Sequence, residues 1–259
     1  MRCSFKTIFL FFIIFFLVNF PLHSFEETLP QLEKARHVLC QLQEKRITSS
    51  YGERDIEGNH YSVRCFEFVY HILEESIPAP AKCELVKLQQ AVLKDLPLSH
   101  HSDMIIPYHY YLIASYLFKN AHISEFWNAY DLSEAKQGDI LIYIDPDYDP
   151  DLKGRTSHQQ LSTHVMFIDY IFKKEDASLA MRVIDSSSRT KGRSYSPKEE
   201  LSENSRIWKK AGIGYSALEI HGHKTKNLGE QTLWNCQWIG QKKTMDKFFA
   251  ILRYENLSK

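Results

Sequence analysis

The chain has 259 residues, of which 44% are hydrophobic and 13% aromatic, so it is long enough to bury a sizeable core. Its 32 lysine and arginine residues balance 32 aspartate and glutamate residues. A balanced charge provides no strong field to attract nucleic acid or an anionic membrane surface. The composition therefore excludes a strongly basic nucleic-acid-binding protein and suits one domain with elaborations or two small domains.

The N-terminus has the layout of a secretory signal peptide. Two basic residues precede an almost wholly apolar run over residues 7–20, and Ser24 follows as a small residue before an acidic stretch. The run is shorter than the roughly 20 residues needed to span a bilayer. We therefore expect a signal peptide over residues 1–24 and a mature domain over residues 25–259, periplasmic or secreted, with no stable membrane association. An uncleaved N-terminal anchor is the alternative.

The cysteines do not indicate a metal site. Cys40, Cys65, Cys83 and Cys236 follow the expected signal peptide, and no CxxC spacing occurs among them. This argues against a zinc ribbon or a thioredoxin-type site. In an oxidising compartment a pair such as Cys40 and Cys83 could form a disulfide, but the sequence does not fix the pairing.

The first half of the mature chain is predicted to be helical. Apolar residues recur at helical spacing over residues 29–45. Ser62 stands in a good N-cap position for the helix that follows it. Two more helices are expected over residues 84–96 and 109–118. Residues 77–136 then form a helical insert between the first core helix and a sheet.

After Gly138 the pattern changes to short β-branched and aromatic runs. They predict strands at residues 139–144, 163–172, 180–184, 213–220 and 248–254. Strands that follow one another without intervening helices imply an antiparallel sheet. The expected fold class is therefore α+β, with N-terminal helices packed on a mostly antiparallel sheet of about five strands.

Cys65 is the candidate nucleophile. With Ser62 as the cap, Cys65 lies in the first turn of its helix, where unbonded N–H groups and the positive end of the helix dipole stabilise a thiolate. Arg64 beside it acts in the same direction. The alternative is a small buried core cysteine.

His164 and Asp185 are the candidate partners of this cysteine. His164 opens a strand, so its imidazole can face the end of a packed helix and act as the base that a cysteine nucleophile needs. Asp185 ends the next strand, and a hairpin would place its carboxylate where it orients the imidazole. The alternatives are a solvated strand-end histidine and a turn aspartate, with Ser186 or Ser187 as the orienting group.

The order of these motifs resembles that of the NlpC-type cysteine peptidases of bacterial cell walls. In that family a cysteine opens a helix, a Gly-Asp strand follows, as with Gly138 and Asp139, a histidine begins an apolar strand, and a polar residue lies on the next strand. The resemblance covers residues 61–187. It implies a papain-like fold and a peptidase or amidase acting on peptidoglycan stem peptides. We expect no metal or organic cofactor.

The residues around Cys65 depart from the family pattern. The family usually has Asp before the cysteine and Ser-Gly after it, where this chain has Arg64, Phe66 and Glu67. An arginine there suits an acidic group, and Tyr61 could line the substrate pocket or simply pack. We therefore predict an exported cysteine hydrolase that cleaves amide bonds. The alternatives are an acyltransferase or transglutaminase-like enzyme on the same fold and a non-catalytic binding module with a decayed site.

Overall fold

The structure, a computed structural model, describes most of the chain after the N-terminal segment. The described residues are 29–44, 48–52, 60–97, 102–121, 123–148, 163–173, 178–187, 212–228, 231–239 and 244–255. The predicted signal peptide, residues 1–24, lies outside them. Within these ranges, no helix combines the length and the apolar character that crossing a membrane requires.

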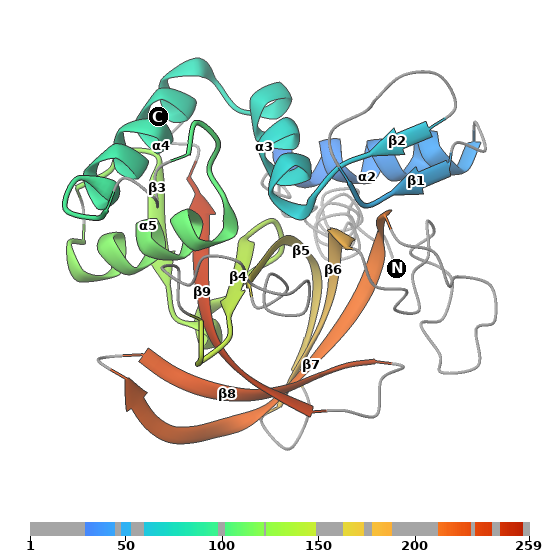
Figure 1. Ribbon diagram of the computed structural model, residues 1–259. Coiled ribbons are helices and arrows are strands. Elements are labelled where there is room, and N and C mark those ends of the chain that lie inside the picture. Colours follow the sequence, from blue (N-terminus) through green and yellow to red (C-terminus); the bar gives the residue numbers. More distant parts are fainter. Residues whose placement is uncertain are drawn as a thin grey trace, which may run out of the picture.

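Helices come first along the chain and strands follow (Figure 1). The α-helices are α2 (Pro30–Glu44), α3 (Cys65–Ser76), α4 (Ala79–Leu93) and α5 (Pro107–Lys119). A short parallel pair, β1 (Thr48–Ser50) and β2 (His60–Ser62), lies between α2 and α3. The remaining elements are β3 (Trp127–Tyr130), the 3-10 helix η2 (Leu132–Glu134), β4 (Ile140–Ile144), β5 (Thr163–Lys173), β6 (Leu179–Ser187), β7 (Gly212–Leu228), β8 (Gln231–Trp238) and β9 (Thr244–Tyr254).

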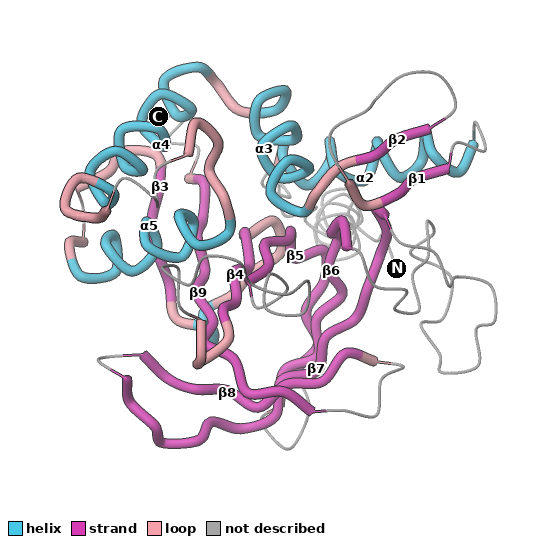
Figure 2. Tube along the Cα trace, in the orientation of Figure 1, coloured by secondary structure: helices cyan, strands magenta, loops and turns pink. Residues whose placement is uncertain are grey.

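Six antiparallel strands form a closed barrel (Figure 2). They follow one another in the order β9, β4, β5, β6, β7 and β8, and β8 pairs back with β9 from Leu233↔Phe248 to Gln237↔Thr244. The predicted papain-like α+β fold, with N-terminal helices packed on a mostly antiparallel sheet of about five strands, is therefore wrong. The prediction lacks β8, and β8 is the strand that closes the barrel.

Both faces of the barrel strands are apolar. On β5, Val165 and Phe167 pack in the cluster that contains the helices, whereas Met166 and Ile168 belong to a second cluster. This second cluster takes residues from all six barrel strands, including the fully buried Trp238. Because successive residues of a strand point to opposite faces, one face meets the helices and the other fills the barrel interior.

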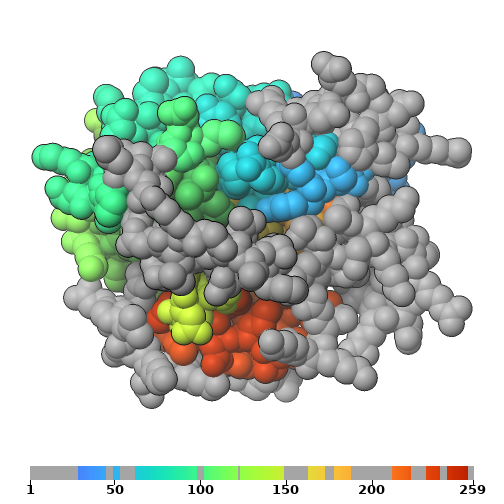
Figure 3. All heavy atoms as spheres, in the orientation of Figure 1, coloured from blue at the N-terminus to red at the C-terminus, as the bar shows by residue number. Residues whose placement is uncertain are grey.

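The helices pack on the barrel through apolar and ionic contacts. Phe68 of α3 meets Phe167 of β5 edge to face, with ring centroids 6.3 Å apart. Arg36 of α2 bonds the buried carboxylate of Asp169 at 2.7 Å, and Arg182 of β6 contacts the same carboxylate. Two guanidinium groups thus compensate one buried charge. In Figure 3 the helices, blue to green, lie above the orange and red C-terminal strands.

The predicted insert, residues 77–136, contains a strand as well as helices. Its helices α4 and α5 pack on each other. Its strand β3 pairs with β9, with Trp127 opposite Tyr254. The buried indole of Trp127 donates a hydrogen bond to the carbonyl of Ala81 in α4, at 2.9 Å. The segment is therefore joined to the wall of the barrel.

Candidate active site

Helix α3 begins at Cys65, and Arg64 occupies the N-cap position. Ser62, the predicted cap, is instead the last residue of β2, so that prediction is wrong. The carboxylate of Glu67 accepts a hydrogen bond from the backbone N–H of Arg64 at 2.8 Å and pairs with its guanidinium at 2.5 Å. This pairing fixes the helix start, so Cys65 lies among the N–H groups that have no intrahelical acceptor, as predicted.

Strands β5 and β6 bring His164 and Asp185 together. Their side chains form a hydrogen bond of 2.5 Å between Nε2 of His164 and Oδ2 of Asp185. The thiol of Cys65 lies within hydrogen-bond distance of the same imidazole. Because Nε2 faces the carboxylate, Nδ1 is the ring nitrogen that remains for the thiol. The three predicted residues therefore form one contiguous set from α3, β5 and β6.

All three side chains of this set are buried, with residue exposures of 3% for Cys65, 7% for His164 and 0% for Asp185. Burial by itself lowers the pKa of His164. The charge on Cys65 and the hydrogen bond with Asp185 outweigh it, so the pKa of His164 lies above its ordinary value. A raised histidine pKa favours the imidazolium, the form that pairs with a thiolate and protonates a leaving group.

Hydroxyl groups hold both ends of this arrangement. The Ser216 hydroxyl on β7 donates to the second carboxylate oxygen of Asp185 at 3.2 Å. The Ser186 hydroxyl donates to the carbonyl of Val63 at 2.7 Å. Ser186, considered above as an orienting group, thus ties β6 to the chain entering α3, and Asp185 is the residue that contacts the imidazole.

Aromatic rings surround the imidazole on the barrel side. The rings of Tyr143 and Trp238 lie 5.6 Å and 6.4 Å from the His164 ring. Lys247 places its ammonium group 5.1 Å from the centre of the Tyr143 ring and pairs with Asp145. Burial lowers the pKa of Lys247 to about 8. The barrel interior next to His164 is therefore largely apolar and contains a buried amine.

Tyr51 is a site residue that no sequence motif indicates. It follows β1, and its half-buried hydroxyl lies within hydrogen-bond distance of the Cys65 thiol. Burial, then the charge and hydrogen bond of Cys65, raise the pKa of Tyr51, so the phenol stays protonated and can donate. Strand β1 is held against β7, because the N–H of Ile213 donates to the Ser49 hydroxyl at 3.2 Å. The pairing of β1 with β2 also brings Tyr51 to the thiol, because the N–H of Val63, two residues before Cys65, donates to the carbonyl of Ser50 at 3.3 Å.

Arg64, one of the two predicted substrate contacts, lies next to Cys65. Its side chain is 40% exposed, and its guanidinium lies 4.7 Å from the centre of the Phe66 ring. The guanidinium of Arg64 forms an ion pair with the buried carboxylate of Glu67. An acidic group of a substrate would therefore compete with that carboxylate for the guanidinium. Tyr61, the other predicted contact, lies in β2, and its side chain falls outside the described part of the chain.

The remaining cysteines lie away from this set. Cys40 and Cys83 are exposed thiols that are not joined by a disulfide. Cys236 is buried inside the barrel. Among the described residues, no group of three or more histidine, cysteine, aspartate or glutamate side chains is placed to hold a metal ion.

Comparisons with known proteins give no match for this chain, whether with protein-family models, with curated proteins or with solved structures.

Proposed function

We propose that this protein is a cysteine hydrolase that cleaves amide bonds, with Cys65 as nucleophile, His164 as base and acid, and Asp185 as the orienting residue. One observation carries the proposal: the hydrogen-bonded series of thiol, imidazole and carboxylate at the start of α3. A nucleophile, a base within reach of it and a third group that orients the base are what covalent catalysis requires. The proposal rests on these residues and not on a papain-like fold.

The proposed reaction has two steps. The Cys65 thiolate attacks the substrate carbonyl carbon, and the His164 imidazolium gives its proton to the departing amine. Water then attacks the thioester while His164 accepts a proton from it, which releases the carboxylic acid and restores the thiolate. The N–H of Cys65 and the hydroxyl of Tyr51 are the donors available for the oxyanion.

For the substrate we propose peptidoglycan stem peptides outside the cytoplasm. This rests on the sequence resemblance to NlpC-type peptidases and on the predicted signal peptide. Arg64 stands where that family has an aspartate, so a carboxylate near the scissile bond suits the site better than a free amino group. Because Glu67 forms an ion pair with this guanidinium, we expect only a moderate preference for substrates with a carboxylate near the scissile bond.

Burial of the thiol favours acyl transfer as a second candidate function. Cys65 is 3% exposed, and aromatic rings surround the imidazole on the barrel side. A site that excludes water protects a thioester from hydrolysis, so that an amine can compete for it. Transfer would use the same three residues and would differ only in the acceptor.

The first experiment follows alkylation of Cys65 by iodoacetamide against pH, in residues 25–259 and in His164→Ala. We expect fast labelling at neutral pH that is lost in the variant, because the imidazolium stabilises the thiolate. Slow labelling that does not depend on His164 would contradict the proposal and favour a non-catalytic binding module.

Substrate cleavage is the second experiment. Cell-wall fragments are incubated with the wild type and with Cys65→Ala, and the products are identified by mass spectrometry. New amino groups with the wild type alone support hydrolysis. Adducts with an added primary amine would instead support acyl transfer.

A further inference from the structure

A pocket of about 230 Å³ lies between α5 and the strands β3, β8 and β9. Each of these elements contributes an aromatic side chain to its lining: Phe118 from α5, Tyr130 from β3, Trp234 from β8 and Phe249 from β9. None of the candidate active-site residues lines it. The pocket is therefore a separate feature of the molecule with an aromatic wall.

The pocket lies where one edge of β9 is open. Strand β8 pairs with β9 from Thr244 to Phe248, and β3 pairs with the same side of β9 from Ile251 to Tyr254. Between these points, Phe249 and Ala250 pair with β4 on one side and with no described strand on the other. Hydrogen-bonded and non-hydrogen-bonded positions alternate along a strand, so one of these two residues turns its N–H and C=O toward the pocket.

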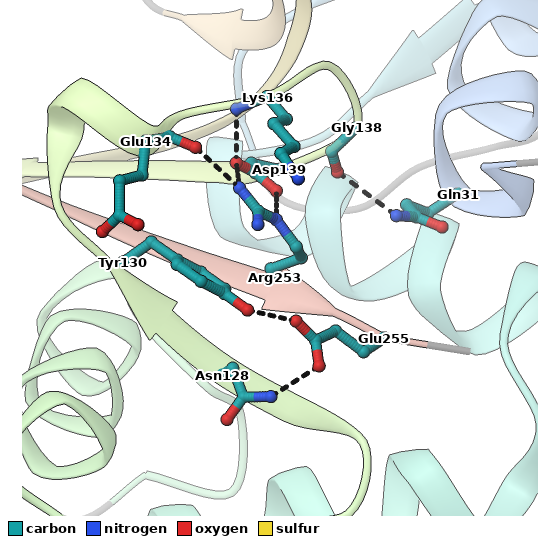
Figure 4. A network of polar contacts seen from close by, with 9 residues as sticks. All are labelled: Gln31, Asn128, Tyr130, Glu134, Lys136, Gly138, Asp139, Arg253 and Glu255. Atoms are coloured by element: carbon teal, nitrogen blue, oxygen red, sulfur yellow. Dashed lines mark hydrogen bonds and ion pairs between the residues drawn. The ribbon is translucent and has the colours of Figure 1, made fainter. Parts of the chain in front are cut away.

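A polar network holds the β3 side of the pocket in place (Figure 4). The Tyr130 hydroxyl and the Asn128 amide both donate to the carboxylate of Glu255. The guanidinium of Arg253 lies 3.9 Å from the centre of the Tyr130 ring and bonds both oxygens of Asp139, at 2.7 and 2.8 Å. Because these contacts fix the ring of Tyr130, a ligand does not have to order this side of the pocket.

The rim of the pocket is exposed and carries both signs of charge. Phe118 is 50% exposed and lines the pocket. Lys119 and Asp131, also exposed, line the same pocket. Opposite charges favour a neutral ligand over an ion, because neither sign is left in excess. A cavity of about 150 Å³ in another protein admits benzene, so this pocket has room for one aromatic ring.

We propose that this pocket binds one aromatic residue of a peptide, with its side chain and its backbone amide. The ring fills the space between Phe118, Trp234 and Phe249, and the amide pairs with the open edge of β9. A blocked aromatic residue supplies both parts: an apolar ring for the lining, and a neutral donor and acceptor for the exposed backbone.

This site is independent of the proposed catalysis but lies near it. The ring of Phe249 is 6.0 Å from that of Tyr143, which is 5.6 Å from the His164 ring. Tyr143 therefore separates the pocket from the candidate active site. Binding is measured in the Cys65→Ala variant, so a missing hydrolase activity and a missing peptide site give distinguishable results.

The test uses Cys65→Ala protein labelled with 5-fluorotryptophan, and the Trp234 fluorine resonance is assigned with Trp234→Phe. We expect N-acetyl-phenylalanine amide to shift this resonance saturably, while N-acetyl-alanine amide does not. Phe118→Ala should weaken binding about tenfold, because it removes one wall from the ring. Tyr116→Ala is the matched control: Tyr116 is an exposed aromatic residue, at 37%, on the same helix, and does not line the pocket.

Two results would overturn the proposal. The first is the absence of a saturable shift with N-acetyl-phenylalanine amide in a protein that otherwise shows native resonances. The second is equal binding of toluene and N-acetyl-phenylalanine amide. That would mean that the pocket takes any apolar ring and that the open edge of β9 contributes nothing.

Discussion

The candidate active site and the aromatic pocket lie on one barrel but are built in opposite ways. In the active site, side chains from separate elements converge on polar contacts, as in those of His164 with Asp185 and Cys65. In the pocket, Phe249 and Ala250 pair with no described strand on one side of β9, and aromatic side chains lie beside them. Converging polar side chains suit bond-breaking chemistry, whereas an open strand edge with aromatic walls suits recognition.

The largest expected effect separates the two sites. Cys65→Ala should reduce the hydrolysis rate at least about a thousandfold, because it removes the proposed nucleophile. The same variant should keep its affinity for N-acetyl-phenylalanine amide. Hydrolase activity is monitored as the release of amino groups from stem peptides, and Phe118→Ala is the reciprocal control. Equal loss of both properties in Cys65→Ala would mean that the two sites are not separate.

Asp185→Asn tests the orienting contact. The carboxylate helps to raise the pKa of His164, so the variant's imidazolium should lose its proton at lower pH. The alkaline limb of the pH–rate profile should therefore move to lower pH, and kcat should fall by about 10² to 10⁴. Initial-rate measurements between pH 5 and 10 would give both the position of the alkaline limb and kcat. An unchanged alkaline limb would show that Asp185 does not act through His164.

Tyr51→Phe tests whether the Tyr51 hydroxyl acts as an oxyanion donor in the active site. It removes a hydroxyl next to Cys65 while keeping the ring, so packing of the half-buried side chain is preserved. We expect kcat to fall by about 10² while KM changes little, as with loss of one oxyanion donor. A change in KM alone would instead assign Tyr51 to substrate binding.

Gly212→Ala tests whether the distant strand β1 positions Tyr51. Gly212 has φ +114°, and an added Cβ would lie 2.6 Å from the backbone of Ser49. We expect the free energy of unfolding to drop by about 1 to 3 kcal/mol, and activity to fall with it. Gly222→Ala, on the same strand, is the control, because its Cβ would meet no atom within 4 Å. Urea denaturation measures both variants, and equal stabilities would contradict the contact with Ser49.

The last prediction concerns the amine inside the barrel. Burial lowers the pKa of Lys247 from 10.5 to about 8, so folding releases a proton from this group between these pH values. Because the unfolded chain binds more protons there, this group's contribution to stability should rise with pH from about 8 to 10.5, by up to about 3 kcal/mol. Lys247→Met should lack this rise. Urea denaturation at pH 7.5 and 10 measures the free energy of unfolding of the wild type and of Lys247→Met. An equal change with pH in both proteins would contradict the prediction.

Local patterns predicted much of the helical part and the central hairpin. The helix over residues 29–45 matches α2, and the strand over residues 163–172 matches β5. Cys65 was found because a helix start is a local signal. His164 and Asp185 were predicted to meet because two consecutive strands joined by a short connection form a hairpin. These inferences need only neighbouring residues, so the sequence is sufficient for them.

The tertiary structure alone decided how the sheet ends and what lies beside the thiol. Trp234, Cys236 and Trp238 alternate along β8 as a strand requires, yet nothing in that pattern says that β8 returns to β9. Closure depends on strand tilt and register summed around the whole sheet. The approach of Tyr51 and the open edge at Ala250 likewise depend on contacts between distant segments. An apolar period of two or 3.6 residues identifies a strand or a helix, but tertiary packing determines which element it packs against.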